Sequence, residues 1–230
     1  MKKLVVMCGL SLIASSAFAA LSRDEVKRLS DAGAILTELR HAPDKGIPEE
    51  LWSKAECVVV IPSMKKAAFV VGAEYGSGVM SCRTRNGWSA PVFMQLAKGS
   101  WGLQIGAEST DLVLLVMNRR GLDKLLADKV SLGADASVAA GPVGRTGAAA
   151  TDAQLTTEML SYSRSQGVFA GIDLSGGVLR PDKEADARGY GTHVSARDIA
   201  VENHRVIAPE QATPFLNALR NEVRATTGRK

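Results

Sequence analysis

Basic side chains that stand next to each other, or two residues apart, are the groups whose spacing most directly suggests a chemistry. An arginine guanidinium binds a phosphate through two parallel hydrogen bonds, and a lysine ammonium binds it as a point charge. Each pair would therefore suit a phosphate group, although ordinary solvated surface has the same composition. The pairs are Lys27 and Arg28, Lys65 and Lys66, Arg83 and Arg85, and Arg119 and Arg120.

The fold decides whether these pairs act together. In a strand, Arg83 and Arg85 would point to the same face because side chains alternate. Lys65 and Lys66 follow Pro62, in a segment that we expect to be a loop between two strands. A single rim that gathered all four cations would favour binding over plain surface.

Groups for catalysis or metal binding are scattered. The three histidines, His41, His193 and His204, have no second ligand two to four residues away, so we expect no metal site. No G-x-S-x-G motif occurs, and Ser77 between two glycines is a turn residue. The run Gly141–Gly147 is rich in glycine but lacks the Gly-Lys-Ser/Thr ending of a phosphate loop, which favours a hairpin turn. We therefore expect no catalytic residue, no cofactor and no enzymatic activity.

Composition points to one folded domain. The 230 residues are 46% apolar and 23% charged, which is enough apolar content for a sizeable core. The net charge of +4 permits contact with anionic surfaces. No run of lysine and arginine interleaved with aromatic residues occurs, so we expect no nucleic-acid partner.

Residues 1–19 are typical of a secretory signal peptide. Lys2 and Lys3 precede a short apolar run, and Ala17-Phe18-Ala19 forms a cleavage site before Ala20. The apolar run is too short to span a membrane. Cys8 lies inside that run, too early for a lipoprotein signal. We expect a periplasmic or secreted protein, with peripheral rather than lipid-anchored membrane association.

Cys57 and Cys82 remain after removal of the signal peptide. In an oxidising compartment two thiols pair, and closing that loop would contribute about 3 kcal/mol. The alternative is two buried free thiols that pack as small apolar groups. We favour the disulfide, although the sequence does not give the required Cα separation.

Two long helices are expected at the ends of the mature chain, residues 20–230. Ser22 and Glu25 form a capping box that opens a helix over 22–40, with apolar residues along one face. Its charges are balanced, whereas a membrane-surface helix is usually rich in lysine, so we favour packing on its own domain. A second amphipathic helix is expected over 209–226.

Between them, a β-rich body is expected over 57–180. Short apolar segments alternate with glycine-rich turns, including Gly76-Ser77-Gly78 and the hairpin signal Asn86-Gly87. So many short strands favour a barrel-like, mostly antiparallel sheet, and hence a single α+β domain with N-terminal, middle and C-terminal helices. The expected strands are 57–61, 67–73, 79–84, 88–96, 101–107, 111–118, 129–140, 157–164, 168–174 and 177–180; helices are expected at 119–128 and 181–188, and 192–208 is expected to be irregular.

The stretch Ser161–Leu174, SYSRSQGVFAGIDL, resembles the signature of the SYLF domain, a lipid-binding module also called the Ysc84-type actin-binding domain. Two further blocks, at 61–83 and 102–145, are similar to that family, and the resemblance runs from about residue 30 to about 191. Arg164 lies inside the signature between buried positions. Both a structural ion pair and a ligand contact suit it.

The resemblance implies binding of anionic phospholipids through the β-rich body and an N-terminal amphipathic segment. Some fungal relatives bind actin, but an exported protein would meet no actin. Our first hypothesis is therefore a non-enzymatic module that binds anionic head groups at an envelope membrane. The basic pairs would supply the electrostatics, and the first helix shallow insertion. Two alternatives stay open: docking of a protein partner, and carriage of an apolar ligand inside the sheet.

Overall fold

The computed structural model describes residues 20–40, 46–68, 71–101, 106–143, 156–165, 168–201 and 206–227. The expected signal peptide, His41, His204 and part of the Gly141–Gly147 run lie outside them. The helices are α1 (Arg23–Arg40), α2 (Glu49–Lys54), α3 (Arg119–Leu125), α5 (Lys183–Tyr190), α6 (Ala196–Ala200), the short 3-10 helix η2 (Glu210–Ala212) and α7 (Thr213–Thr227).

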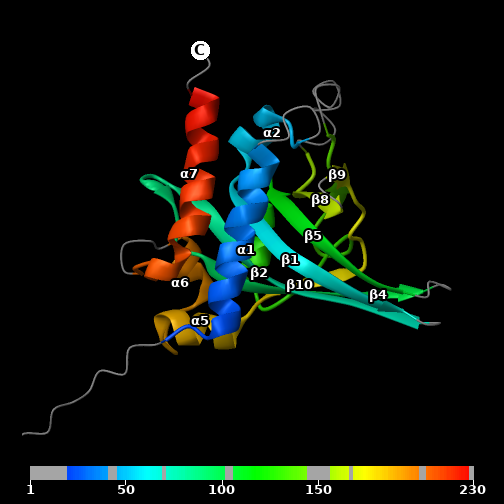
Figure 1. The fold of residues 1–230 in the computed structure, drawn as a ribbon, viewed down its shortest axis with the longest axis horizontal. Coiled ribbons are helices and arrows are strands. Elements are labelled where there is room, and N and C mark those ends of the chain that lie inside the picture. The colour runs from blue at the N-terminus through cyan, green and yellow to red at the C-terminus, as the bar shows by residue number, and fades with distance from the viewer. Residues whose placement is uncertain are drawn as a thin grey trace, which may run out of the picture.

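A single curled sheet forms the centre of the molecule, and helices pack against it (Figure 1). The strand order is β6-β10-β4-β2-β1-β5-β8-β7, with β3 on β2 and β9 on β8. All pairs of these strands are antiparallel except β7 with β8. The expected α+β domain with a barrel-like, mostly antiparallel sheet is confirmed, as an open half-barrel. The strands are β1 (Cys57–Ala68), β2 (Val71–Thr84), β3 (Gly87–Trp88), β4 (Val92–Trp101), β5 (Gly106–Val116), β6 (Val130–Ser131), β7 (Val138–Ala140), β8 (Met159–Ser165), β9 (Val168–Gly171) and β10 (Gly177–Pro181).

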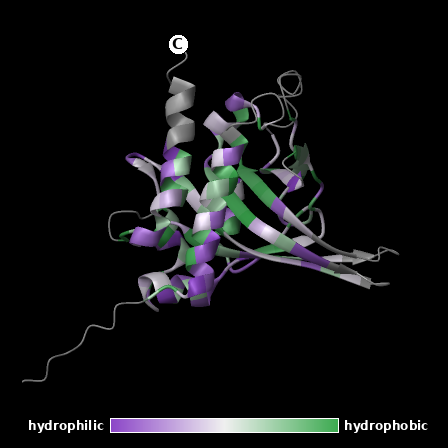
Figure 2. Ribbon diagram, in the orientation of Figure 1, coloured by the Kyte–Doolittle hydropathy of each residue, from purple (hydrophilic) through white to green (hydrophobic). Residues whose placement is uncertain are grey.

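The central strands β1 and β5 are buried on both faces. Because neighbouring side chains point to opposite faces, Val58 and Val60 enter one core cluster, while Val59 and Ile61 enter the other. The first cluster lies under α1, α2 and α7, and the second under α3 and α6. A strand that is covered on both faces requires a nearly continuous run of apolar residues. In Figure 2 these hydrophobic residues appear green in the middle of the sheet.

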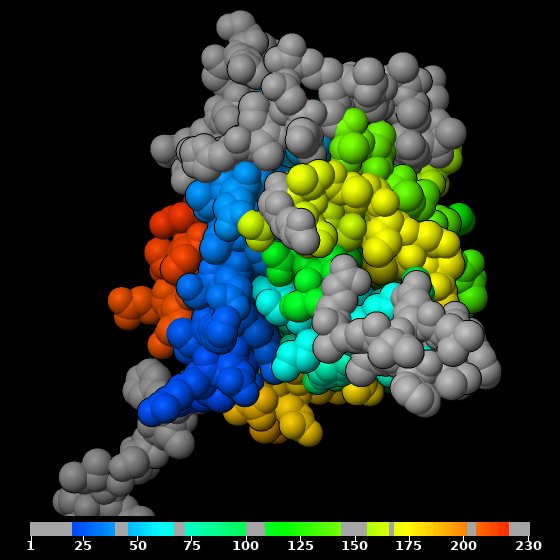
Figure 3. Space-filling view, turned by 45° about the vertical axis from the view of Figure 1, so that its right-hand side comes forward, coloured from blue at the N-terminus to red at the C-terminus, as the bar shows by residue number. Residues whose placement is uncertain are grey.

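Helix α1 begins as expected. The Ser22 amide donates to the Glu25 carboxylate, and the Glu25 amide donates back to the Ser22 hydroxyl, which is the capping box read from the sequence. The helix packs side by side with α7, and Gly33 allows close approach, since a Cβ there would lie 3.0 Å from the Phe215 backbone nitrogen. In Figure 3, α1 lies in the molecular surface beside α7.

The expected turn at Gly76-Ser77-Gly78 is wrong, because these residues lie inside the continuous strand β2. The strand β1 likewise continues past Pro62, through a bulge at which Ser63 has a φ of 49° and the pairing register shifts. The loop expected at Lys65 and Lys66 and the separate strand expected over 67–73 are therefore wrong, because Lys65 and Lys66 lie in β1 and Ala67 pairs with Ala73 of β2. The bulge brings the two backbones together: a Cβ at Gly78 would lie 2.0 Å from the Val60 carbonyl oxygen. Gly76 and Gly78 therefore allow β1 and β2 to approach closely, and they do not form a turn.

Three further expectations are corrected. The strand expected over 88–96 is two strands, because Pro91 has no amide to donate and separates β3 from β4. The strand expected over 129–140 is interrupted by a turn, in which Gly133 has a φ of 88° and Asp135 accepts the Ser131 amide. The stretch 192–208 is not wholly irregular, because Ser195 caps the short helix α6.

The expected disulfide is confirmed. Cys57 and Cys82 face each other across β1 and β2 and are joined, in the core cluster beneath α3 and α6. The Asn86-Gly87 hairpin is confirmed as well, since it connects β2 to β3. Both features tie down the same end of β2.

Replacing Gly78 by alanine should destabilise the protein by about 3 kcal/mol or more, because the new Cβ would collide with backbone that cannot move aside. The control is Gly99→Ala on β4, where nothing lies within 4 Å of the added Cβ. Urea unfolding measures both variants. Equal stabilities for the two would contradict the close contact between β1 and β2.

Removing the disulfide with the double substitution Cys57→Ala and Cys82→Ala should lower the free energy of unfolding by about 3 kcal/mol, since the link closes a separation of 25 residues. Dithiothreitol should lower the stability of the unmodified protein by a similar amount and leave the double variant unchanged. A midpoint that does not respond to either treatment would show that the two cysteines are not joined.

Candidate functional site

Three chain segments meet at one end of the sheet. Strand β1 begins there, and its first residue, Cys57, pairs with residues near the ends of both β2 and β5. Strands β2 and β5 therefore end on either side of the start of β1. Arg83 at the end of β2, Arg85 just after it and Arg119 at the start of α3 line one cavity there.

Arg83 is held rigidly at this place. Its Nε donates to the Ala55 carbonyl oxygen at 2.8 Å, and its Nη2 donates to the Trp52 carbonyl oxygen at 2.9 Å. The guanidinium carbon lies 4.7 Å from the centre of the Trp88 ring, in cation–π contact. Burial lowers the pKa of the guanidinium, partly offset by the charge of Glu56. Among the described residues, no carboxylate lies within ion-pair distance of Arg83.

The three arginines line a cavity of about 800 Å³. Arg85 is exposed and makes no ion pair with any described residue, whereas Arg119 lies 4.0 Å from Asp123. None of the described lining residues is acidic. We call this site the arginine cavity; the rest of its described lining consists of Thr84, Asn86, Leu122, Ala200 and Val201.

Arg120 follows Arg119 in the chain, but its side chain is not part of the described lining of the arginine cavity. Its Nε lies 3.9 Å from the buried Glu158 carboxylate, while most of its side chain is exposed. Burial alone would raise the pKa of Glu158, but the bonds from Lys124 and the Ser137 amide hold it below its usual value. Arg120 can therefore add charge near the arginine cavity without lining it.

The other basic residues lie apart from the arginine cavity. Lys65 pairs with Tyr75, eight residues along β1 from Cys57, which is roughly 26 Å of strand. Lys66 lies 3.6 Å from Glu74. A groove of about 330 Å³ brings Lys65 together with Lys27 and Arg28 of α1, but Asp24 and Asp31 also line it. The fold thus does not gather Lys65, Lys66, Arg83 and Arg85 at one rim.

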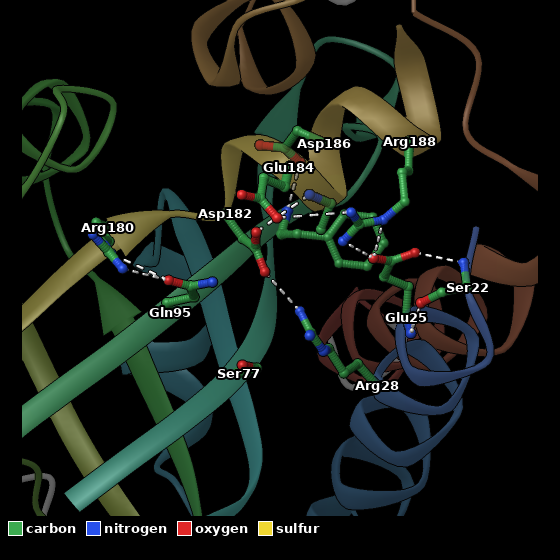
Figure 4. Close-up of polar contacts among 12 residues, drawn as sticks. Ser22, Glu25, Arg28, Ser77, Gln95, Arg180, Asp182, Glu184, Asp186 and Arg188 are labelled. Carbon is green, nitrogen blue, oxygen red and sulfur yellow. Dashed lines mark hydrogen bonds and ion pairs between the residues drawn. The ribbon is translucent and has the colours of Figure 1, made fainter. Parts of the chain in front are cut away.

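Lys27 and Arg28 are both ion-paired. Lys27 bonds to Asp31 one turn along α1, and Arg28 bonds to Asp182 at 2.9 Å. Arg28 belongs to a partly buried polar network that joins the start of α1 to α5 (Figure 4). In the same network, Arg188 donates to the Glu25 carboxylate at 2.7 Å.

The network holds its carboxylates ionised. Burial would raise the pKa of Glu25, but the bonds from Arg188 and Ser22 outweigh it and lower the pKa. The same balance, with Arg28 and Gln95 as donors, lowers the pKa of Asp182. These pairs fix α1 to the fold, and they leave little free charge for a ligand.

The apolar face of α1 is unavailable for membrane insertion. Leu29 and Leu36 are fully buried, and Leu39 is nearly so, against the sheet and α7. The prediction that this helix packs on its own domain is confirmed. The expected shallow insertion of its apolar residues is not supported in this arrangement. Within the described residues, no helix is long and apolar enough to cross a membrane.

Arg164 of the signature stretch makes a structural ion pair. Its guanidinium bonds to Asp111 on β5 at 2.9 Å and to Glu38 on α1. Asp111 also accepts the amide of Ser63 in the β1 bulge. Of the two roles that the sequence left open, the geometry supports the ion pair that joins β8, β5 and α1.

A buried acid stands out in the remainder of the polar groups. Asp186 on α5 accepts the Phe93 amide, and burial raises its pKa to about 8, with the Asp182 charge adding to the rise. No sequence signal identified it. The described residues contain no group of three histidine, cysteine or acidic residues that could hold a metal ion, and His193 is exposed.

Known proteins resemble this chain over most of its length. A model of the family described as Las17-binding protein actin regulator matches residues 97–222. SH3 domain-containing YSC84-like protein 1 of Rattus norvegicus is 34% identical over 181 residues, which cover 77% of this chain and 53% of that protein. Protein YSC84 of Saccharomyces cerevisiae is 32% identical over 180 residues, covering 76% of this chain and 38% of that protein. The chain thus spans about half, or less, of these curated relatives.

The buried Asp186 makes stability depend on pH. Because its folded pKa is about 8 and its ordinary value is 3.8, the folded state holds a proton that the unfolded state releases between these values. Stability should therefore fall as pH rises from 5 to 7.5, by up to about 1.4 kcal/mol per unit from this group.

Asp186→Asn should remove that slope, so the variant should gain stability relative to the unmodified protein at pH 7.5 more than at pH 5. The exposed Glu184→Gln, on the same helix, is the control. Urea unfolding at the two pH values provides the comparison. Parallel pH profiles for Asp186→Asn and the unmodified protein would rule out a protonated Asp186.

Proposed function

This chain belongs to the Ysc84 family of Las17-binding protein actin regulators, and on that premise we propose that it is a non-enzymatic module that binds anionic phospholipid surfaces through Arg83, Arg85 and Arg119. The family is described by binding to Las17, and a yeast relative is named LAS seventeen-binding protein 3; both descriptions name binding rather than a catalysed reaction. The predicted signal peptide would place the surface in the cell envelope, where the actin connection of the family would not apply.

The arginine cavity is the observation that carries the proposal. It unites three cations from two strand ends, with no acidic residue in its described lining. Arg119 has one exposed carboxylate 4.0 Å away, that of Asp123, and Arg83 and Arg85 have no described ion pair. Elsewhere in the described structure, Lys27, Arg28 and Lys66 have carboxylate partners. A basic residue near an anionic membrane contributes on the order of 1 kcal/mol, so several cations that are not already neutralised are what such binding needs. Arg120 would add to the same field.

Docking of a protein partner is the second candidate, and a different surface favours it. The groove between α1 and β1–β2 mixes Lys27 and Lys65 with Asp31, and it includes the half-exposed aromatic ring of Tyr75. Alternating charge beside an aromatic side chain suits a protein surface better than a uniformly anionic membrane. One relative, LAS seventeen-binding protein 3 of Saccharomyces cerevisiae, is named for binding a partner protein. An enclosed apolar ligand is disfavoured, because core side chains fill both faces of the described sheet centre.

Vesicle co-sedimentation tests the first candidate. Binding should rise with the anionic lipid fraction and fall with salt, because the attraction is electrostatic. The double substitution Arg85→Glu and Arg119→Glu should weaken binding at least tenfold, since it removes two cations and adds two repulsive charges. These side chains are exposed, so the variant should keep its unfolding midpoint.

The matched control is Lys129→Glu with Lys183→Glu, which makes the same charge change at exposed residues outside the arginine cavity. It should weaken binding far less. Equal loss in the two double variants would reduce the effect to net charge, and absence of binding to every lipid composition would overturn the proposal.

A further inference from the structure

The arginine cavity has one feature that general attraction to a membrane does not require. Arg83 is half-buried, and its guanidinium is fixed by two carbonyl oxygens and the Trp88 ring. A membrane surface is served as well by flexible, exposed cations such as Arg85. A rigid cation that is partly withdrawn from water is costly where no described carboxylate forms an ion pair with it, and the nearby charge of Glu56 offsets only part of the effect of burial. A bound anion would relieve the rest of that cost.

The donor count of Arg83 leaves hydrogen bonds for such an anion. A guanidinium has five N–H groups, and the Ala55 and Trp52 carbonyl oxygens accept one each. Three remain, and Arg83 lines the cavity together with Arg85 and Arg119. Since Arg83 is already immobilised, an anion that binds it pays little for ordering this side chain.

Three guanidinium groups match one ligand chemistry best. We propose that the arginine cavity recognises a phosphate monoester, an inference that rests on the proposed function and names the ligand class of its site. A monoester carries up to two negative charges at neutral pH and three free oxygen atoms. A phosphate diester, as in most head groups that link two alcohols, carries one charge and two free oxygen atoms. The additional charge and acceptor are what a third arginine can use.

The remaining lining fits the carbon part of such a ligand. Leu122, Ala200 and Val201 provide an apolar wall from α3 and the end of α6, and Asn86 and Thr84 provide polar groups beside it. The volume of about 800 Å³ exceeds that of a bare phosphate ion, so an esterified group fits inside. Both a lipid head group and a free phosphorylated metabolite supply such a phosphate.

Two assays separate these sources. The first compares vesicles that contain phosphatidic acid, a monoester, with vesicles that contain phosphatidylglycerol, a diester, at matched zeta potential. The second is calorimetry with glycerol 3-phosphate in solution. We expect about tenfold tighter binding to phosphatidic acid, and displacement of the protein from those vesicles by millimolar glycerol 3-phosphate.

Variants assign the preference to residues. Arg83→Lys keeps the charge but cannot hold both carbonyl oxygens and the ligand, so it should lose the tenfold preference while still binding phosphatidylglycerol. Because this variant also loosens the contact with α2, its unfolding midpoint is measured alongside. Arg85→Gln and Arg119→Gln, which do not hold the fold together, should each reduce the preference severalfold. Lys183→Gln should not.

Each outcome decides a separate claim. Equal binding of both vesicle types, with no binding of glycerol 3-phosphate, would overturn the monoester site and leave the membrane function standing. Binding of glycerol 3-phosphate without any vesicle binding would support the site with a free ligand and overturn the membrane function. Absence of binding in both assays would overturn both.

Discussion

Strand β1 is paired along both edges and covered on both faces. The other elements of the fold must therefore pack so that both of its faces stay buried. Its valines alternate between two core clusters, one beneath α1, α2 and α7 and the other beneath α3 and α6. The apolar stripe of α1 cannot then stay in water, because it is one wall of the first cluster. The same pairing brings the ends of β2 and β5 together beside the start of β1, which is where the arginine cavity forms.

Burial makes an unpaired charge costly, and several charged groups beside the core are ion-paired. Glu25 is paired with Arg188, Asp182 with Arg28, and Arg164 with Asp111 and Glu38. Asp186 takes the other solution, since its raised pKa keeps it protonated at neutral pH. Against this background Arg83 is different: it is partly withdrawn from water, yet only carbonyl oxygens and an aromatic ring face it among the described residues.

Local signals in the sequence were sufficient for local structure. The capping box at Ser22, the Asn86-Gly87 hairpin and the pairing of Cys57 with Cys82 all appear as expected, because each depends on residues close in the chain or on a small set of alternatives. Strand register is different. Nothing in the sequence shows that Pro62 lies in a bulge rather than at a strand end, so the sequence predicts a turn at Gly76 and Gly78, where the structure has a continuous strand.

Because the sequence does not give the strand register, it does not show which basic pairs form the site. The sequence shows which basic residues occur, but not which of them lie close together. That depends on the strand pairing, which places Lys65 far from the ends of β2 and β5. The fold then divides the cations by environment: Lys27 and Arg28 on α1 are ion-paired, and Arg83, Arg85 and Arg119 line one cavity whose described lining contains no acid. A ligand bound there would also stabilise the contact between α2 and β2, because the Arg83 guanidinium that binds it also donates to the Trp52 and Ala55 carbonyl oxygens. Binding and local stability at this end of the sheet are therefore linked through one side chain.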